Sequence, residues 1–479
     1  MSDLPLDRSH PVAGTAAAAV PPHVTLPDRG IHDTSPAASW TDGFLTGNGE
    51  HGAVLHGSPA LEKVVLNHHR LVLPNGTRTV RPPVLSGRLD SVRDKALAGD
   101  YAGASRDFAA GWSLRWTQTY HPAYELRLSS PALTTVTDYG RVTDFRTGEV
   151  GSSWTDQYGT WRRRAFVSRA DNVIVHELIP APGRTIDITL SVDTALEEVP
   201  ADVAFTTRAT LGNGDGYLNL RATYPSGQGA FGYEGVTRVV ATGPDSSVAV
   251  SGSTIVVTGA TRVILLTRLD RYESATAWNS EPLHAQLATI GTDYATLLSA
   301  HTAIHTELYD RSRLDLRVSD ADRKLSVSEL IARQNAHRNT IDLALLERLY
   351  DSGRYLFISS SGVLPPRLTG IWTGSWNGAW ADDFTTDANI NLQVAGANIL
   401  DTTEVMQGYF DLILGQLSDW RTNATHPPLR RPRLPRPLPH RRRVRPHAPL
   451  RRRGLPGPLL DRRRRLAAVP DAGVLRGHG

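Results

Sequence analysis

Short runs of alternating apolar and polar residues, separated by turn residues, recur from about Trp40 to Glu273. Such runs, rich in β-branched residues, are typical of strands whose side chains point alternately to the two faces of a sheet. The clearest are Tyr124–Leu128, Arg164–Ser168, Val173–Leu178, Thr185–Val192, Leu218–Tyr224, Ser247–Val250, Thr254–Thr258 and Arg262–Arg268. Many short strands at this spacing predict an antiparallel β-sandwich.

The hydrophobic period changes after residue 275. Apolar residues then recur at three- and four-residue steps, which is the spacing of a helix with one buried side; they are Leu283, Leu287, Ile290, Tyr294 and Leu297. Further helical patterns cover Ser326–Arg333, Thr340–Tyr355 and the stretch from about Leu392 to Trp420, with a loop at Ser359–Asp383. We therefore expect a β domain, a helical connector and a helical domain, in that order.

The chain contains no cysteine, which excludes disulfides, thiolate metal ligands and a cysteine nucleophile. Its first residues, MSDLPLDRSH, are acidic, and only the short apolar run Ala16–Val20 follows them. A signal peptide needs a basic start and a longer apolar core, and no run approaches the ~18 apolar residues that span a bilayer. We expect an extended segment over residues 1–35 and a soluble chain without a membrane partner, with the cytoplasm favoured.

The character of the chain changes after Thr425. Residues 426–479 contain 16 Arg, 11 Pro and two Asp, without Lys or Ser, whereas the whole chain has a net charge of only +4. The preceding residues therefore carry about −10. One interpretation is a disordered basic tail that binds nucleic acid or another polyanion. The interpretation we favour is a shifted reading frame, because GC-rich codons read out of step give Arg, Pro, Gly, Ala and Leu.

Two short motifs could indicate a ligand site. Gly47–Gly52 matches GxGxxG, but a dinucleotide site needs a βαβ unit, and the surrounding pattern is β-rich. Glycine turns within the sandwich are the favoured explanation. His68 and His69 could suggest a metal, but adjacent residues on a strand point in different directions and no carboxylate motif accompanies them. We predict no metal and no cofactor.

Trp372, Trp376 and Trp380 alternate with glycines and follow two prolines. In a helix, three Trp four residues apart would form one buried stripe. The glycines favour a loop instead, where indole rings suit the apolar faces of sugars. Sugar contact by at least one of them is the favoured hypothesis, and core packing is the alternative.

The segment TTDANINLQ is the densest polar stretch before the last helical pattern. In extended backbone, Asn389 and Asn391 would face the same way and could jointly position a water molecule or a substrate hydroxyl. The alternative is a helix entry capped by Asp387 or Asn389. Spacing alone favours the capped helix.

Several blocks of this sequence resemble glycoside hydrolase family 95, the 1,2-α-L-fucosidases, in the order expected for that family. They span roughly residues 36–424 and read GFLTGNGEHGAVLHG, LEKVVLNHHRL, SVRDKALAGDYAGA, TYHPAYELRL, RRRAFVSRADNVIVHEL, HTAIHTELYDRSRLDL, LERLYDSGRYLFISSS, LPPRLTGIW and NINLQ. The resemblance implies an N-terminal β super-sandwich (36–275), a helical linker (276–320) and the beginning of an (α/α)6 catalytic barrel (321–424). Residues 425–479 would then be an Arg/Pro-rich tail.

The resemblance also implies an inverting hydrolysis of terminal fucosyl linkages. A Glu acts as general acid, and an Asp, assisted by two Asn that match Asn389 and Asn391, activates the water. Two departures lie at the substrate site: Asp387 stands where many members have His, and Val394-Ala395-Gly396 replaces NYW. These departures leave open a related L-sugar.

The family's acid and base belong downstream of NINLQ, and no carboxylate here matches them. We therefore expect a glycan substrate, with Asp387 and the three Trp contacting it, but an inactive chain as printed. The competing hypothesis is a non-catalytic protein that binds carbohydrate through its β domain or polyanions through its basic tail. Binding of nucleic acid is expected only if that tail is genuine.

Overall fold

The computed structural model describes residues 20–76, 86–111, 117–130, 135–227, 229–277, 279–386 and 388–425. The chain divides into two compact units. The larger consists of Met1–Pro74 with Gln118–Tyr409, and the smaller of Asn75–Thr117 with Phe410–Gly479.

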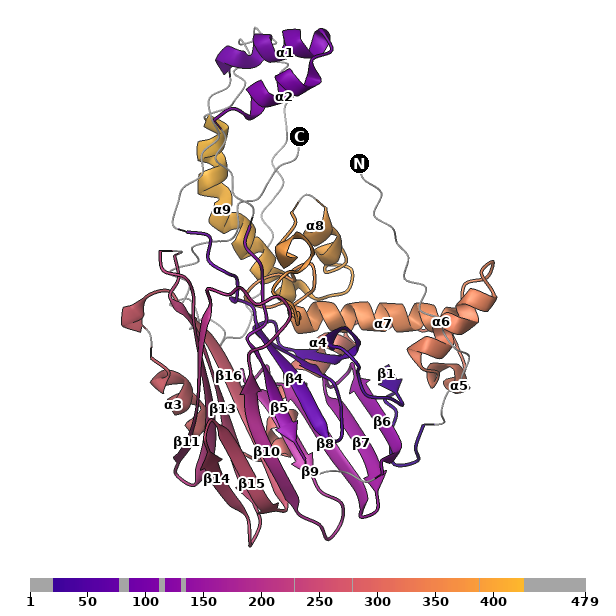
Figure 1. The fold of residues 1–479 in the computed structure, drawn as a ribbon. Coiled ribbons are helices and arrows are strands. Elements are labelled where there is room, and N and C mark those ends of the chain that lie inside the picture. Colours follow the sequence, from indigo (N-terminus) through magenta and orange to yellow (C-terminus); the bar gives the residue numbers. More distant parts are fainter. Residues whose placement is uncertain are drawn as a thin grey trace, which may run out of the picture. The chain divides into compact units, whose positions relative to one another are not determined.

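Within the described part of the larger unit, the strands form two antiparallel sheets, as the alternating pattern predicts (Figure 1). One is nine-stranded, in the order β1-β6-β7-β8-β9-β16-β13-β12-β11, and the other is seven-stranded, in the order β14-β15-β10-β5-β4-β3-β2. The strands are β1 Gly30–Asp33, β2 Phe44–Gly47, β3 His51–Leu55, β4 Leu61–His68, β5 Tyr124–Ser129, β6 Thr137–Asp144, β7 Val150–Asp156, β8 Gly159–Val167, β9 Ile174–Ile179, β10 Ile186–Asp193, β11 Ala204–Gly212, β12 Asp215–Thr223, β13 Gly232–Thr242, β14 Ser247–Ser251, β15 Thr254–Ala260 and β16 Arg262–Tyr272.

The core lies between the sheets, and β16 shows how the sequence builds it. Val263 and Leu265 belong to the inter-sheet cluster, whereas Ile264 and Leu266 pack on the opposite face of the same strand. Both faces are buried, so this strand reads as a continuous apolar run. Each fully buried aliphatic side chain contributes roughly 1.5–3 kcal/mol to folding.

The helices follow β16, apart from two short ones in the smaller unit. Their bounds are α1 Leu89–Leu97, α2 Tyr101–Ala109, α3 Glu281–Thr289, α4 Tyr294–Asp310, α5 Asp320–Arg323, α6 Val327–Ala336, α7 Leu343–Ser360, α8 Asn389–Val394 and α9 Gln407–Thr425. None of the helices among the described residues is long and apolar enough to cross a lipid bilayer.

The connector helices cover the outer face of the nine-stranded sheet. Leu283 and Leu287, one helical turn apart on α3, pack with Tyr294 and Leu297 of α4 against that face. Asp293 caps α4 by accepting a hydrogen bond from the amide of Thr296 at 2.8 Å. The predicted helical stripe is thus real, but it is divided between two helices at residues 290–293.

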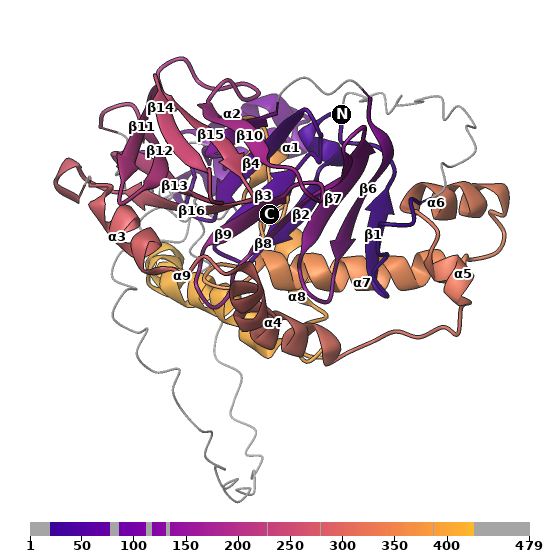
Figure 2. The ribbon, with the colours of Figure 1, turned by 90° about the horizontal axis from the view of Figure 1, so that it is seen from below.

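Helix α7 joins this connector to the segment that follows. Tyr355 and Ile358 of α7 pack with Leu308 and Tyr309 of α4 and with Phe145 after β6. Figure 2 shows α4 and α7 beside the strands in the view from below. This packing fixes the C-terminal end of α7, from which the Trp-rich loop starts.

One expectation about local structure was wrong. The region from Trp40 to Glu273 is not entirely β, because α1 and α2 lie within it. The Asp100 side chain accepts from the amide of Gly103 and caps α2, a signal that the sequence contained. The helical pattern from about Leu392 to Trp420 corresponds to two α-helices, since α8 ends at Val394 and α9 begins at Gln407. Of the expected extended segment at 1–35, residues 1–19 lie outside the described residues, whereas residues 20–35 are described and include β1, which pairs with β6 in the nine-stranded sheet. The tail at 425–479 lies outside the described residues apart from Thr425.

Candidate functional site

The Gly/Pro/Trp-rich segment from Ser361 to Asp383, here called the Trp loop, is irregular apart from the short 3₁₀ helix Ala379–Asp382. It is attached to the sandwich by hydrogen bonds. Asn67 of β4 donates to the carbonyl of Thr373 at 2.8 Å, and the Tyr120 hydroxyl donates to the carbonyl of Ile371 at 2.8 Å. The loop is therefore held by the outer face of the seven-stranded sheet.

The three Trp of the loop have different surroundings. Trp372 is 4% exposed and its indole N–H donates to the carbonyl of Thr46 at 2.9 Å. Trp376 is 3% exposed and stacks on His121, with ring centroids 3.6 Å apart. Trp380 is 66% exposed. Two of the rings thus pack in the interior, and Trp380 is the one whose surface is open to a ligand.

The backbone around Trp380 is strained. Trp380, Ala381 and Asp382 have φ values of 51°, 59° and 48°, the left-handed region that non-glycine residues rarely adopt. Residues in such regions each cost about 1–3 kcal/mol and are kept where the surroundings impose them. Here the amide of Tyr120 donates to the carbonyl of Ala381 at 2.9 Å. The strained turn holds the Trp380 indole at the surface.

The strained turn ends on a buried carboxyl group. Asp382 is buried, and one of its oxygens, Oδ2, has no hydrogen-bond partner. Burial raises the pKa of Asp382 to about 6, although the Thr373 hydroxyl and the positive charge of Arg367 oppose the shift. The Arg367 guanidinium lies over the rings of Phe384 and Tyr120, at 4.0 and 4.7 Å. Sequence reasoning passed over Asp382, because its burial is invisible in the sequence.

The Asn pair lies on helix α8 and not in extended backbone. Successive helical residues are rotated by about 100°, so Asn389 and Asn391 point to nearly opposite sides of the helix. Both are exposed; Asn391 donates to the carbonyl of Thr386 at 3.0 Å and accepts from the Tyr409 hydroxyl at 3.0 Å. Ala388 occupies the cap position, without a side-chain hydrogen bond. Asp387 lies outside the described residues.

A second polar cluster includes a residue of the GxGxxG motif. Gly47–Gly52 forms a hairpin between β2 and β3, in agreement with the glycine-turn interpretation. Glu50 in this turn lies close to the end of β4, and its side chain comes within 4.8 Å of ring nitrogens of His68 and His69. Burial disfavours ionisation of Glu50, but the imidazoles of His68, 3.7 Å away, His51 and His69 together hold the pKa of Glu50 below its ordinary value. Burial lowers the pKa of His51 to about 3.

Sequence reasoning missed the third member of this cluster. Glu50 is 18 residues before His68, and only the β3–β4 register, which pairs His51 with His68, brings them together. His69 follows the last residue of β4, so the alternation of a strand does not separate it from His68. The amide of His69 donates to the carbonyl of Glu50 at 2.9 Å.

Glu404, the first Glu after α8, has a structural contact. Glu404 forms an ion pair with Arg311 at 2.8 Å, and Arg311 also donates to the carbonyl of Asp401. Arg311 binds Glu307 at 2.7 Å as well. Glu404 is therefore engaged in linking α4 to the segment before α9.

Comparison with known proteins agrees with the order of the two domains. Residues 31–272 match the glycosyl hydrolase family 65 N-terminal domain, and residues 293–427 match the glycosyl hydrolase family 95 catalytic domain. A probable alpha-fucosidase A of Aspergillus oryzae is 25% identical over 405 residues, covering 79% of this chain and 54% of that protein. An alpha-L-fucosidase 2 of Arabidopsis thaliana is 24% identical over 388 residues, covering 75% and 45%. The chain thus spans about half the length of these curated relatives.

A solved structure described as a putative kojibiose phosphorylase from the human microbiome shares the fold, with a TM-score of 0.51 at 9% identity, over 86% of this chain and 51% of that one. The sandwich, the helices that follow it and the matched domains define a glycoside hydrolase by family. The chain belongs to the glycoside hydrolases that carry a family 65-type N-terminal domain, and the segment after this domain matches the family 95 catalytic domain.

Proposed function

We propose that this protein derives from, and retains the sugar site of, an inverting glycosidase that acts on terminal α-L-fucosyl or related L-sugar linkages of glycans. The observation that carries the proposal is the family 95 catalytic-domain match over residues 293–427, which includes the Trp loop and α8. The relatives named as alpha-fucosidases support the same substrate class.

In this proposal, Trp380 contacts the apolar face of the sugar, because it is the exposed ring of the Trp loop. Trp372 and Trp376 hold the loop from the interior. Asn389, Asn391 and Asp387 contact the water or the substrate hydroxyls. An amide is a poor base, so the Asn pair needs a carboxylate that accepts the proton. Inversion needs two carboxyl groups about 6.5–9.5 Å apart, with the water between one of them and the sugar.

We further propose that the chain as printed binds the sugar without turning it over. None of the carboxylates in its described part matches the family's acid or base, and Glu404 is paired with Arg311. Loss of one general acid or base slows such reactions by about 10²–10⁴-fold. We therefore expect the chain to bind the sugar but not to hydrolyse the glycosidic bond.

The test titrates the full 479-residue chain with 2′-fucosyllactose and with lactose while tryptophan fluorescence is recorded. A saturable change with the fucosylated sugar alone is expected, and Trp380→Ala should abolish most of it. Trp420→Ala, at another partly exposed indole, is the matched control. Equal responses to both sugars, or none, would reject the fucoside proposal.

Release of fucose is measured on the same samples. No release above that of a buffer blank is expected. If fucose is released and Asp382→Asn abolishes the release, then Asp382 supplies the catalytic carboxyl group and the proposed inactivity is wrong.

A second candidate function rests on the 16 Arg of residues 426–479, which lie outside the described residues. If these residues are genuine, they favour binding to nucleic acid or another polyanion. Binding of the full chain to a DNA duplex should then weaken steeply between 50 and 200 mM salt, as counterion release requires.

A further inference from the structure

The cluster at the β2–β3 turn combines donor groups that the proposed hydrolysis does not use. Glu50 comes from the turn, and His68 and His69 come from the end of β4. One ligand atom from each of these side chains lies within 4.8 Å of the other two. His68 and His69 are buried, while the Glu50 side chain keeps 29% of its surface exposed. The cluster is thus lined by rigid imidazoles and open on the carboxylate side.

The spacing suits a small divalent ion. Metal–ligand bonds of about 2.0–2.1 Å in a tetrahedron place two ligand atoms about 3.3–3.5 Å apart. His68 Nε2 and Glu50 Oε1 are 3.7 Å apart. The partly exposed Glu50 carboxylate can close this gap, because it is the least confined of the three groups. The ligand atoms of the cluster all lie within 4.8 Å of one another, so rotation of the side chains has to bring the remaining pairs closer.

A second, independent observation also points to a ligand. The Nδ1 atom of His69 is buried and has no hydrogen-bond partner. Buried polar atoms in folded proteins nearly always have one, so an unpartnered imidazole nitrogen on a histidine of this cluster calls for an explanation. A bound cation supplies it, because the lone pair of a neutral imidazole is a metal ligand.

The fold holds the cluster in place. His51 stands across from His68 in the β3–β4 register, with ring centroids 4.8 Å apart. The ring of His51 is itself held by Asn172 at 3.1 Å and by the backbone of Leu269. Such supporting contacts orient metal ligands in known sites.

One hydrogen bond in this cluster would have to break when a metal binds. The amide of Arg70 donates to Nδ1 of His68 at 3.3 Å, which favours a proton on Nε2. Binding through Nε2 moves that proton to Nδ1 and gives up this hydrogen bond. At 3.3 Å the bond lies at the long end of the normal range, so a modest rotation of the ring is enough to break it.

We propose that Glu50, His68 and His69 bind one divalent transition-metal ion of the zinc type. Two imidazoles and one carboxylate are ligands that such ions prefer, whereas Mg²⁺ and Ca²⁺ select oxygen. Three protein ligands leave a fourth position for water. The site adjoins the Trp loop, since the guanidinium of Arg367 donates to the carbonyl of His69 at 3.4 Å. The ion would thereby stiffen the hairpin against which this loop is held.

The test uses the full chain, stripped with a chelator and titrated with Zn²⁺ and, in parallel, with Co²⁺ as a spectroscopic probe. We expect one tight equivalent of Zn²⁺, a rise in the unfolding temperature, and visible Co²⁺ absorption of a four-coordinate site. Glu50→Gln and His69→Gln should each weaken the tight equivalent at least tenfold. His337→Gln, at an exposed histidine on the end of α6, is the matched control and should leave it unchanged.

Several outcomes would overturn the proposal: no tight equivalent, a tight equivalent that both site variants retain, or one that His337→Gln removes. If His69→Gln does not fold, Glu50→Gln still decides, because its partly exposed side chain is replaced by one of the same shape. These readouts do not involve a sugar, so their failure leaves the proposed glycosidase ancestry untouched.

Discussion

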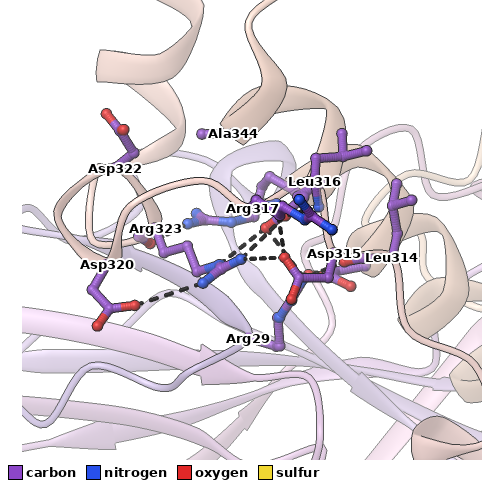
Figure 3. A network of polar contacts seen from close by, with 12 residues as sticks. Arg29, Leu314, Asp315, Leu316, Arg317, Asp320, Asp322, Arg323 and Ala344 are labelled. Atoms are coloured by element: carbon purple, nitrogen blue, oxygen red, sulfur yellow. Dashed lines mark hydrogen bonds and ion pairs between the residues drawn. The ribbon is translucent and has the colours of Figure 1, made fainter.

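At the scale of single residues, Arg29 shows how charge is used inside this molecule. It is buried just before β1, and its guanidinium donates to Asp351 of α7 at 2.8 Å and to the carbonyl of Leu314 at 3.0 Å. Glu347 lies 3.4 Å away. Arg323 binds the same Glu347 at 3.0 Å, and Figure 3 shows it between Asp315 and Asp320. The network links the N-terminal segment of the larger unit to α5 and α7.

Replacing Arg29 by Met should cost about 3–5 kcal/mol of unfolding free energy, because the buried Asp351 would lose its cation and Glu347 would keep only Arg323. Urea unfolding measures the loss. Arg313→Met removes an exposed ion pair with Asp28 and should cost less than about 1 kcal/mol. Equal effects of the two changes would show that the buried network is not stabilising.

Asp382 predicts a pH dependence with a definite sign. Its pKa is raised to about 6 in the folded protein, so the folded state binds more protons than the unfolded state between about pH 4 and pH 6. Its contribution to stability is therefore lost as the pH rises through that window. Relative to the wild type, the free energy of unfolding of Asp382→Asn should therefore rise by at most about 3 kcal/mol between pH 4 and pH 7.

Thermal or urea unfolding of both proteins at pH 4 and pH 7 provides the measurement. Asp320→Asn, at an exposed carboxylate, is the control and should follow the wild type. A variant difference that is the same at both pH values would mean that Asp382 is not a strained, buried acid.

At the scale of elements, the strained turn Trp380–Asp382 is the clearest case of local preference overruled by its surroundings. Glycine adopts φ near +59° without strain, so Ala381→Gly should stabilise the protein by up to about 1 kcal/mol. Ala303→Gly, at an exposed position within α4, should destabilise it by about 1 kcal/mol. If both changes destabilise the protein, the left-handed turn is not strained in solution.

The connector helices make a second prediction at this scale. Leu287 of α3 is fully buried against the nine-stranded sheet, so Leu287→Ala should cost about 2–5 kcal/mol. Leu346→Ala, at a partly exposed position of α7, should cost much less. A negligible loss at Leu287, measured by urea unfolding, would mean that α3 does not pack stably on the sheet.

At the scale of the whole molecule, the chain joins an acidic, patterned part to residues 426–479, which lie outside the described residues. We propose that reading the gene in another frame after codon 424 restores helix-patterned sequence, with a Glu and an Asp suited to acid and base roles. Sequencing the gene tests this directly. Stop codons within a few dozen triplets in both other frames would show that the Arg-rich residues are genuine, and the polyanion-binding function would then be favoured. The domain boundaries near residues 275, 320 and 424 stay predictions.

The sequence by itself determined the order of the secondary structure in the larger unit. Alternation at a period of two located half-buried strands such as β10, and continuous apolar runs located fully buried strands such as β16, each to within a few residues. The change to a period near 3.6 located α3, α4 and α7. Both signals are local, and the helices of the smaller unit, α1 and α2, were missed because their faces carry no long apolar stripe.

Only the tertiary structure decided which polar residues meet and which aromatic rings are covered. Trp372 and Trp380 have similar sequence surroundings, yet one is buried on the sheet and the other is exposed. Glu50 reaches His68 and His69 through strand register, and Asp382 acquires its raised pKa from burial. Burial and proximity depend on contacts between residues far apart in the chain, and a local pattern of side chains does not contain them.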